Sequence, residues 1–599
     1  MPDWSYHVLF KPILSRLPAT TSRNFIHKGM SRIASIPGGS AFINFLGREE
    51  SSWRLEKEIG ELHFSNSIGL SGKLDPHLSG TKAFSHLGFG FIEVGPVTMN
   101  ARNGTSPVID RKNNTIHFSE PLESLGVIET RDRLIQQQPT QPVFIRLSGT
   151  IGEKLHLMNA LTDVADAFIV EYDDAKVTGH FDTVDKPIYL AIPSSEIESF
   201  SVDSIQFSCS GLVLNEGPKQ IDSIIRQSHQ HALHYLKSNH VSLPIITVGG
   251  VLEPADALSL LDSGADLIML TSGYVFSGPG LPKRIKEAQL DRLTKKNHNF
   301  KGWGWYFLFG FSIMIGGLIT LLLSMTTIIL PYDEYFLEMT RSRVESFNER
   351  ILAFMAHDRM TLAGTMISGG LLYMFLAKYG VKQGLSWAKQ TIDVAAIIGF
   401  LGILLFIGYG YFDWLHLLFW MVLLPFYIMG FVKTRSIRET ATSGNRHNHL
   451  VWKRSLLGQF CFILLGFSFV LGGAIISYIG VTNVFVATDL LYLCMPPDLL
   501  DDFNQRLIPM IAHDRAGFGS ALLSVGLLVL MVSLWGFQQG NRWVWWALFI
   551  GGIPAFTSGI AIHFAIGYTT FIHLLPAYFA LFLYVIGLIC SYRSFHLTK

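Results

Sequence analysis

A chain of 599 residues is too long for a single domain, and its 47 Lys and Arg against 46 Asp and Glu give a formal net charge of +1. That balance excludes a generally basic nucleic-acid-binding protein. Only 16% of the residues are charged, against about 25% in a typical soluble domain, so part of the chain is expected to lie in a lipid bilayer. The four cysteines form no paired motif, which excludes a disulfide scaffold and a cysteine-ligated zinc site.

The N-terminal half has the pattern of an α/β barrel. Up to about residue 300, short apolar runs alternate with helical patterns, and none is long enough to span a bilayer. Eight such runs fit a (β/α)8 TIM barrel in residues 46–290, because its parallel strands are buried on both faces. The predicted strands are residues 65–72, 91–97, 142–148, 167–172, 187–192, 211–216, 244–250 and 266–271.

The last two predicted strands end in small residues. Gly249 and Gly250 end the seventh strand, and Thr271, Ser272 and Gly273 end the eighth. In TIM barrels a phosphate site is often built from these two neighbouring loops, where glycines let backbone N–H groups reach the phosphate oxygens. We therefore predict a site for a phosphate-containing small molecule here. The alternative is that both are tight turns that simply require glycine.

Four segments of this half, residues 68–75, 88–98, 244–251 and 266–279, resemble the membrane-associated, quinone-using class of dihydroorotate dehydrogenases. The resemblance covers residues 1 to about 290. It implies an FMN cofactor whose phosphate lies on strands seven and eight, hydride transfer from dihydroorotate to the flavin, and electron transfer to quinone. The cofactor-binding residues that it implies are Ser71, Gly72, Thr98, Gly249, Gly250, Thr271, Ser272 and Gly273.

Residues 1–45 fit the same resemblance. They are similar to the two amphipathic helices that dock this class on the bilayer and lead quinone to the flavin. Lys11, Pro12 and Arg16 interrupt the first 17 residues, so no secretory signal is expected there. The apolar positions are Trp4, Val8, Leu9, Ile13, Leu14 and Leu17, then Phe25, Ile26, Met30 and Ile33.

The substrate end of the site departs from the family. The family has Asp-Lys after its first strand, whereas this chain has Asp75-Pro76, so that lysine is missing. Ala191 stands where the family has the flavin-binding lysine of its fifth strand. Asp174 stands at the position of the catalytic serine and is our candidate base. Loss of a positioned base costs about 10²–10⁴ in rate, and Glu171 beside it would repel an anionic substrate. We therefore do not expect dihydroorotate turnover.

Eight apolar stretches follow residue 300, each long enough to span a bilayer. With eight spans, the loops richest in Lys and Arg all fall on one side of the membrane. The basic segment 283–301 and the C-terminal tail fall on that same side. The positive-inside rule then places both termini and the barrel in the cytoplasm, at the inner or plasma membrane. The stretches are residues 304–330, 360–377, 390–411, 414–432, 455–479, 516–536, 543–566 and 570–591.

The membrane half is a tandem repeat. Residues 310–312, 347–350 and 356–359 recur, with a single Glu to Gln change, as 466–468, 503–506 and 512–515, each pair 156 residues apart. Residues 407–409 and 416–418 match 566–568 and 573–575 at slightly larger offsets. We predict two parallel four-helix repeats in an all-α domain, residues 291–437 and 438–599.

Each repeat brings ionisable side chains to the outer mouth of its second span. They are expected to form an interfacial ion-pair cluster that fixes the helix ends, because charges at a membrane boundary are costly unless paired. The alternative is a haem, metal or anion site that pairs His357 with His416, and His513 with His573. His563 in the seventh span is expected to be a hydrogen-bonded bundle histidine. The cluster residues are His357, Asp358, Arg359, His416, His513, Asp514, Arg515 and His573.

Three functions stay open at this stage. The first is an FMN oxidoreductase of the dihydroorotate dehydrogenase type that is anchored to its own membrane domain and feeds electrons into it, with its substrate and electron acceptor left open. The second is a non-catalytic relative whose barrel regulates or scaffolds the membrane repeats. The third is a carrier or channel with the barrel as its regulatory domain, which the parallel repeat suggests. The bilayer is the one partner that all three share, and no nucleic acid is expected.

Overall fold

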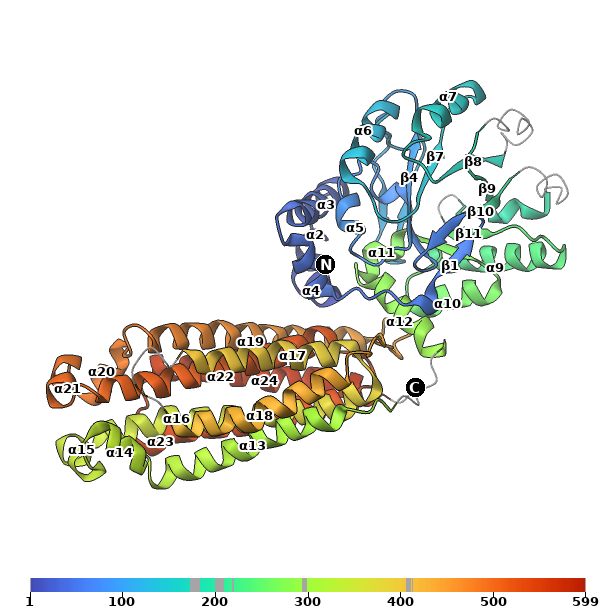
Figure 1. Cartoon of the computed structure of the whole chain (residues 1–599). Coiled ribbons are helices and arrows are strands. Elements are labelled where there is room, and N and C mark those ends of the chain that lie inside the picture. The colour runs from blue at the N-terminus through green and yellow to red at the C-terminus, as the bar shows by residue number, and fades with distance from the viewer. Residues whose placement is uncertain are drawn as a thin grey trace. The chain divides into compact units, whose positions relative to one another are not determined.

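The computed structural model describes residues 2–172, 184–199, 209–217, 220–293, 299–405, 411 and 413–597 (Figure 1). The chain divides into two compact units. The first comprises residues 1–294 together with residues 442–453, and the second comprises residues 295–441 and 454–599. Each unit is described by itself.

Eight parallel strands close the predicted barrel in the first unit. Their order is β10-β11-β12-β3-β4-β7-β8-β9, and the ring closes where Met269 of β12 pairs with Gly69 of β3. All eight predicted strands are confirmed. Their bounds are β3 (Ile68–Leu70), β4 (Phe91–Val97), β7 (Val143–Leu147), β8 (Ala167–Glu171), β9 (Ile188–Pro193), β10 (Gly211–Asn215), β11 (Ile245–Val248) and β12 (Leu267–Leu270).

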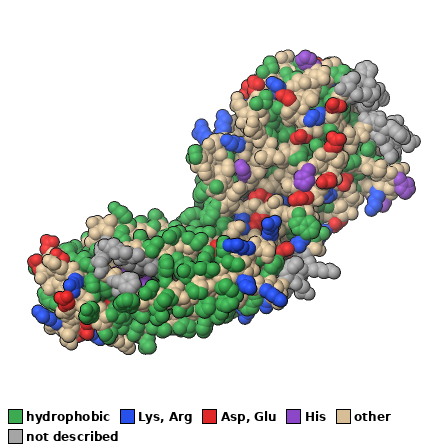
Figure 2. All heavy atoms as spheres, viewed as in Figure 1, with side chains coloured by type: hydrophobic (Ala, Val, Ile, Leu, Met, Phe, Trp, Pro, Cys, Tyr) green, Lys and Arg blue, Asp and Glu red, His purple; other side chains and the backbone are tan. Residues whose placement is uncertain are grey.

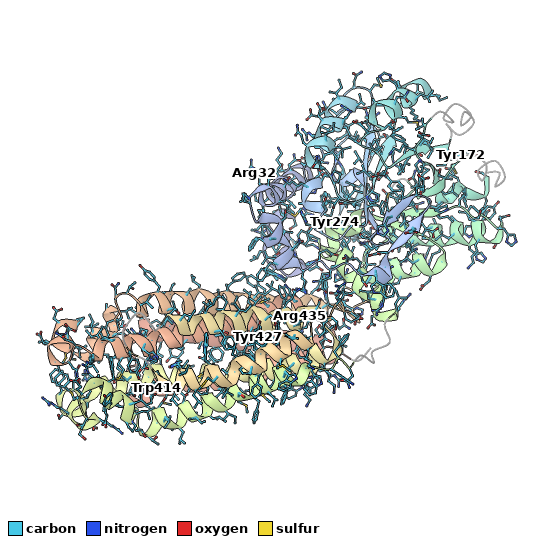
Figure 3. All side chains as sticks on the ribbon, viewed as in Figure 1. Arg32, Tyr172, Tyr274, Trp414, Tyr427 and Arg435 are labelled. Atoms are coloured by element: carbon cyan, nitrogen blue, oxygen red, sulfur yellow. The ribbon has the colours of Figure 1, made fainter. Side chains whose placement is uncertain are left out.

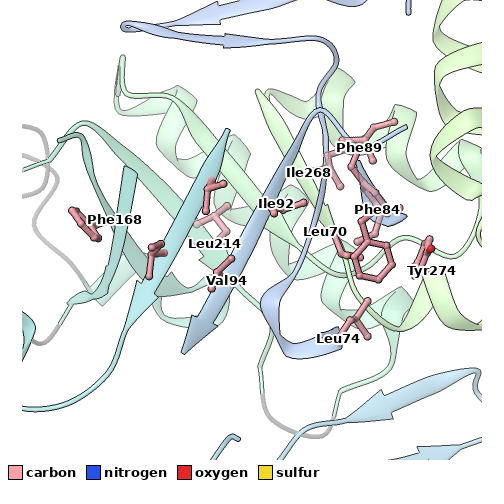
Figure 4. Packing of buried hydrophobic residues seen from close by; sticks show 14 of the residues in the cluster. Leu70, Leu74, Phe84, Phe89, Ile92, Val94, Phe168, Leu214, Ile268 and Tyr274 are labelled. Atoms are coloured by element: carbon pink, nitrogen blue, oxygen red, sulfur yellow. The ribbon is translucent and has the colours of Figure 1, made fainter. Parts of the chain in front are cut away.

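Aromatic side chains fill the inside of the barrel, and aliphatic side chains pack between its strands and the surrounding helices. Phe64 packs edge-on against Phe91 at 5.7 Å between ring centroids, and Phe91 lies 5.3 Å from Phe144. Phe64 ends a short hairpin, β1 (Lys57–Ile59) and β2 (Leu62–Phe64), which closes the amino-terminal mouth of the barrel. Outward-facing strand residues such as Leu70 and Ile268 pack under the helices (Figure 4). Burial of this kind stabilises the barrel by roughly 1.5–3 kcal/mol for each large side chain.

Helices surround the barrel, and a second hairpin, β5 (Val108–Asp110) and β6 (Thr115–His117), lies at its carboxyl-terminal mouth. The hairpin reaches the start of α11, because the backbone N–H of Ile116 donates to Ser272 Oγ at 3.0 Å. The helices are α1 (Asp3–Ser5), α2 (Lys11–Leu14), α3 (Ala19–Ser35), α4 (Gly39–Gly47), α5 (Thr81–Phe84), α6 (Val127–Gln137), α7 (Ile151–Leu161), α9 (Asp222–Ser238), α10 (Pro254–Ser263), α11 (Ser272–Ser277) and α12 (Leu281–Leu293).

The second unit is helical. Among the residues that the structure describes, seven of its helices are long and apolar enough to cross a membrane. Helix α17 occupies the place of the third predicted span but is not among the seven, so the count of eight stays a prediction. The helices are α13 (Trp303–Thr326), α14 (Pro331–Leu337), α15 (Arg341–Phe347), α16 (Glu349–Phe375), α17 (Ser386–Leu404), α18 (Trp414–Lys433), α19 (Leu450–Gly480), α20 (Ala487–Leu493), α21 (Pro497–Phe503), α22 (Leu507–Trp535), α23 (Arg542–Ala565) and α24 (Phe571–His596).

The surface of this unit fits a bilayer. Figure 2 shows hydrophobic side chains covering the visible face between charged ends. Large apolar side chains such as Leu322, Leu471 and Ile589 are exposed in this unit. Trp414 and Arg435 mark opposite ends of the α18 segment (Figure 3). An aromatic residue at one boundary and basic residues at the other are typical of membrane spans.

The predicted repeat is visible in the helix bounds. Helices α14 and α15 correspond to α20 and α21 with every boundary shifted by 156 residues, and α16 corresponds to α22. The equivalent residues Phe347 and Phe503 stack face to face, 3.7 Å apart between centroids. Asn348 donates to the carbonyl of Leu493 at 3.0 Å, and the equivalent Asn504 donates to that of Leu337 at 2.8 Å. Such reciprocal contacts indicate a pseudo-two-fold axis at the phenylalanine pair. The predicted match of residues 407–409 lies outside the described residues.

Candidate functional site

The predicted phosphate turn lies where expected, between β11 and β12. Gly249 and Gly250 both have positive φ, +80° and +75°, which only glycine adopts readily. The N–H of Gly249 donates to the carbonyl of Met269 at 3.0 Å. The N–H of Gly250 donates to Oδ1 of Asp222 at 3.0 Å. A carboxylate of the chain itself thus occupies one of the donors predicted for a phosphate.

A second carboxylate lies over the same turn. A Cβ atom built on Gly249 would be 2.8 Å from Oε2 of Glu216 and 3.0 Å from Oγ1 of Thr271. The other carboxylate oxygen of Glu216 forms an ion pair with Lys73 at 2.9 Å. Burial, and after it the nearby Glu216 charge, raise the pKa of Asp222 to about 7. The turn is therefore lined by acidic groups.

The centre of the carboxyl-terminal mouth holds an ion-pair network. Glu93 on β4 accepts hydrogen bonds from Ser71 Oγ at 2.7 Å and from the N–H of Gly72 at 2.9 Å. Arg146 on β7 binds Glu93 and also Glu171, the latter at 2.8 Å. Burial alone would raise the pKa of Glu93, but the Arg146 guanidinium holds it below its ordinary value. Ser71 and Gly72 are thus engaged by a buried carboxylate.

The other predicted cofactor-binding and catalytic residues do not all come together at the turn. Thr98 bonds locally, through its N–H to Ser124 Oγ at 3.1 Å and through its hydroxyl to the carbonyl of Asn100 at 2.7 Å. Ser272 accepts from the hairpin residue Ile116, and Gly273 has no room for a side chain because a Cβ would lie 1.6 Å from the carbonyl oxygen of Val251. The candidate base Asp174 lies outside the described residues. The structure therefore groups Gly249, Gly250, Thr271 and Ser272 around the turn and places Thr98 elsewhere.

These groups do not fit a phosphate dianion as they stand. The N–H of Gly249 already donates to the carbonyl of Met269, and that of Gly250 to Asp222, so neither predicted donor of the turn is available to a phosphate. FMN therefore stays a prediction from the resemblance alone. Sequence reasoning missed Asp222, although an aspartate that opens a helix after a strand end is a visible signal.

An apolar cavity lies under the N-terminal helices. It has a volume of about 340 Å³ and is lined by residues of α2, α3 and the β5–β6 hairpin, among them Leu14, Ile26, Met30 and Phe118. The predicted apolar positions divide between two faces of these helices. Trp4, Leu14 and Met30 are buried, whereas Leu9, Ile13, Leu17, Phe25 and Ile33 are exposed. An exposed apolar face of this kind is typical of a membrane-docking surface.

The helical unit brings the predicted charged residues into two equivalent networks that join the repeats. Arg359 of the first repeat binds Asp514 of the second at 2.7 Å and Asp333 of its own repeat at 3.1 Å. Arg515 of the second repeat binds Asp358 of the first at 3.3 Å, and Asp489 of its own. The predicted charged residues therefore form ion pairs, with partners exchanged across the pseudo-two-fold axis.

The same exchange corrects the predicted histidine pairs. His357 lies beside His573, with 5.8 Å between ring centroids, and His513 lies beside His416 at 4.8 Å. The prediction that each pair forms within one repeat was wrong, because the second span of each repeat packs against elements of the other. Two groups result, His357–His563–His573 and Asp413–His416–His513. In each group the ligand atoms lie within 4.8 Å of one another.

Sequence reasoning missed several members of the two ion-pair networks. Asp333 and Asp489 are 156 residues apart and could have been found by that offset. Tyr411 and Tyr568, which donate to these two aspartates, also nearly repeat. His563 was expected only as a hydrogen-bonded bundle histidine, because the first repeat has no histidine at the equivalent position.

The comparisons with known proteins concern the N-terminal half. No protein-family profile matches the chain. It is 23% identical over 347 residues to a dihydroorotate dehydrogenase (quinone) of Christiangramia forsetii, covering 48% of this chain and 99% of the relative. It is 22% identical over 366 residues to the protein of that name from Nostoc punctiforme, covering 50% and 91%. A solved structure of DHODH from Eimeria tenella in complex with ferulenol aligns at 17% identity and a TM-score of 0.35, covering 42% of this chain and 89% of that one.

Proposed function

We propose that the protein is a multi-span membrane protein whose dihydroorotate dehydrogenase-like barrel is a non-catalytic docking module. In this account the barrel binds the segment that connects the two membrane repeats and so controls their arrangement. The barrel and both termini lie on the cytoplasmic side of the inner or plasma membrane. The single observation that carries the proposal is the contact between the barrel and residues 442–453.

The connecting segment is held by specific contacts. Asn448 accepts from Arg284 at 2.6 Å and donates to the carbonyl of Leu252 and to Ser277 Oγ, at 2.8 and 3.0 Å. Its own N–H donates to Glu253 Oε2 at 2.8 Å. Every one of these partners lies in the loops and helices that follow β11 and β12.

Charged and aromatic groups add further contacts between the barrel and the connecting segment. Arg446 forms an ion pair with Asp291 at 3.0 Å, and its carbonyl accepts from the N–H of Ala255 at 3.0 Å. The guanidinium of Arg284 lies 4.2 Å from the ring centroid of Trp452 and pairs with Asp3 at 2.8 Å. The loops and helices that follow β11 and β12 thus bind the chain's own connecting segment.

The docking proposal predicts that Asn448→Ala exposes the connecting segment. The variant loses three side-chain hydrogen bonds, each worth about 0.5–1.5 kcal/mol, so cleavage within residues 442–453 by a limiting protease should accelerate at least about tenfold. Limited proteolysis of the detergent-solubilised full chain, with mass spectrometry of the fragments, measures this. His449→Ala, at the neighbouring exposed position, is the matched control and should cleave at the wild-type rate. Equal rates for both variants would contradict docking.

The second candidate is an FMN- and quinone-dependent oxidoreductase with a substrate other than dihydroorotate. The relatives named above and the 340 Å³ apolar cavity favour it, since a cavity of this size and lining suits a hydrophobic ring compound. The acidic turn at Gly249 and Gly250 counts against it. If this candidate were correct, the purified protein would carry flavin.

A further inference from the structure

We propose that the helical unit binds transition-metal ions at two pseudo-symmetric sites. The first is formed by His357, His563 and His573, and its counterpart by Asp413, His416 and His513. The expected ligand is a first-row divalent ion that favours imidazole, with Zn²⁺ as the probe. This inference concerns the membrane repeats and is independent of the role proposed for the barrel.

The strongest observation is the hydrogen bonding of two facing imidazoles. Nδ1 of His357 lies 2.9 Å from Oδ1 of Asp358, and Nδ1 of His563 lies 2.5 Å from the carbonyl oxygen of Gly559. Both partners are acceptors, so each Nδ1 carries the ring proton and each Nε2 carries a lone pair. The two Nε2 atoms nevertheless face each other at 3.0 Å. Two lone pairs at this distance require a cation between them, either a metal ion or a proton.

The surroundings favour a metal ion. His573 brings a third nitrogen to the site from the start of α24. In a tetrahedral zinc site with Zn–N bonds of about 2.0–2.1 Å, two nitrogens are about 3.4 Å apart, so the observed pair needs to open by only a few tenths of an ångström. The contact of His357 with Asp358 is the carboxylate–histidine arrangement that orients metal ligands in proteins.

The local charge supports the same conclusion. The two networks and the Asp413 group contain five aspartates and two arginines, so their formal charge is three units negative. They are Asp333, Asp358, Asp413, Asp489, Asp514, Arg359 and Arg515. Uncompensated carboxylates inside a membrane protein are costly, and two divalent ions would offset this excess.

The counterpart site uses equivalent residues with a different third ligand. His513 and His416 correspond to His357 and His573, and Asp413 takes the place that His563 has in the first site. Nδ1 of His416 lies 2.8 Å from Oδ2 of Asp413. This group borders a cavity of about 210 Å³ between helices of the unit. A porphyrin is excluded at the first site, because the rings of His357 and His563 are only 4.4 Å apart between centroids.

Zinc stoichiometry tests the proposal. The full chain in detergent is stripped with a chelator, dialysed against buffered Zn²⁺ and analysed by mass spectrometry. We expect two ions per chain for the wild type and for the control His449→Ala, and one for His563→Ala and for His416→Ala. Loss of one ligand should weaken the affected site at least about 100-fold. Co²⁺ added to the stripped wild type should give the visible absorption of tetrahedral imidazole coordination, a readout that needs no variant.

Two results would overturn the proposal. If the wild type takes up no more Zn²⁺ than His357→Ala/His513→Ala and shows no Co²⁺ absorption, the facing imidazoles share a proton instead. If both single variants keep two ions, the metal binds elsewhere on the chain.

Discussion

Replacing Arg515 with alanine is expected to lower the free energy of unfolding of the helical unit by about 3–5 kcal/mol. The guanidinium binds Asp358 of the other repeat and Asp489 of its own, and it also donates to the carbonyl of Val484 at 2.7 Å. Its removal leaves two buried carboxylates without their cation, and each of these side chains is at most 3% exposed. One of the lost ion pairs, that with Asp358, also connects the two repeats.

The measurement is denaturant unfolding of the full chain in detergent, with thermal unfolding as a second readout. Arg506→Ala is the control, because that arginine lies just before the same helix and is 45% exposed. It forms a surface pair with Glu338 and donates to the carbonyl of Phe336 at 2.7 Å, so it also contacts the other repeat, but without burial. Surface pairs contribute at most about 1 kcal/mol. A loss no larger for Arg515→Ala than for Arg506→Ala would show that the network does not hold the repeats together.

The stability of the barrel is expected to fall as the pH rises from about 4 to about 8, and Asp222→Asn should remove much of this fall. The folded pKa of Asp222 is raised from its model-compound value of 3.8 to about 7 by burial and by the Glu216 charge. The folded state therefore binds the proton more tightly than the unfolded state does. That contribution is complete below the unfolded pKa and is lost as the pH passes the folded pKa. Its size is up to about 4 kcal/mol.

Pulse proteolysis of the full chain in urea measures the stability of the barrel at a series of pH values, because fragments of the barrel are identified by their mass. The asparagine can still accept from the N–H of Gly250, so the turn should keep its shape. The other groups around Asp222 are Glu216, Thr115 and Asp256, and all of them stay in the variant. Asp262→Asn, an exposed position, is the control and should follow the wild type. A pH dependence unchanged in Asp222→Asn would refute the role assigned to this carboxylate.

Much of the fold could be predicted from the sequence because its signals are local and periodic. The barrel strands are short apolar runs, and every one of the eight was found. The hairpins β1–β2 and β5–β6 were missed, because each strand has only three residues and β5 is largely exposed. The repeat was found because one offset links several motifs, and the helix bounds keep that offset.

The sites were less predictable because they depend on contacts between distant segments. The sequence indicated that Gly249 and Gly250 form a turn, but no local pattern shows that Asp222 and Glu216 lie against it. The histidines were placed at the correct ends of their helices. Their partners were assigned within one repeat, and only the packing of the two repeats shows that His357 meets His573.

We propose that the barrel serves as a docking module and not as a flavin enzyme. The absorption spectrum of the full chain, purified in detergent and supplemented with FMN before gel filtration, distinguishes the two roles. We expect no flavin bands in the protein peak, because two carboxylates occupy the turn that a phosphate would need. A stoichiometric flavin spectrum, above all one that dihydroorotate bleaches, would contradict it.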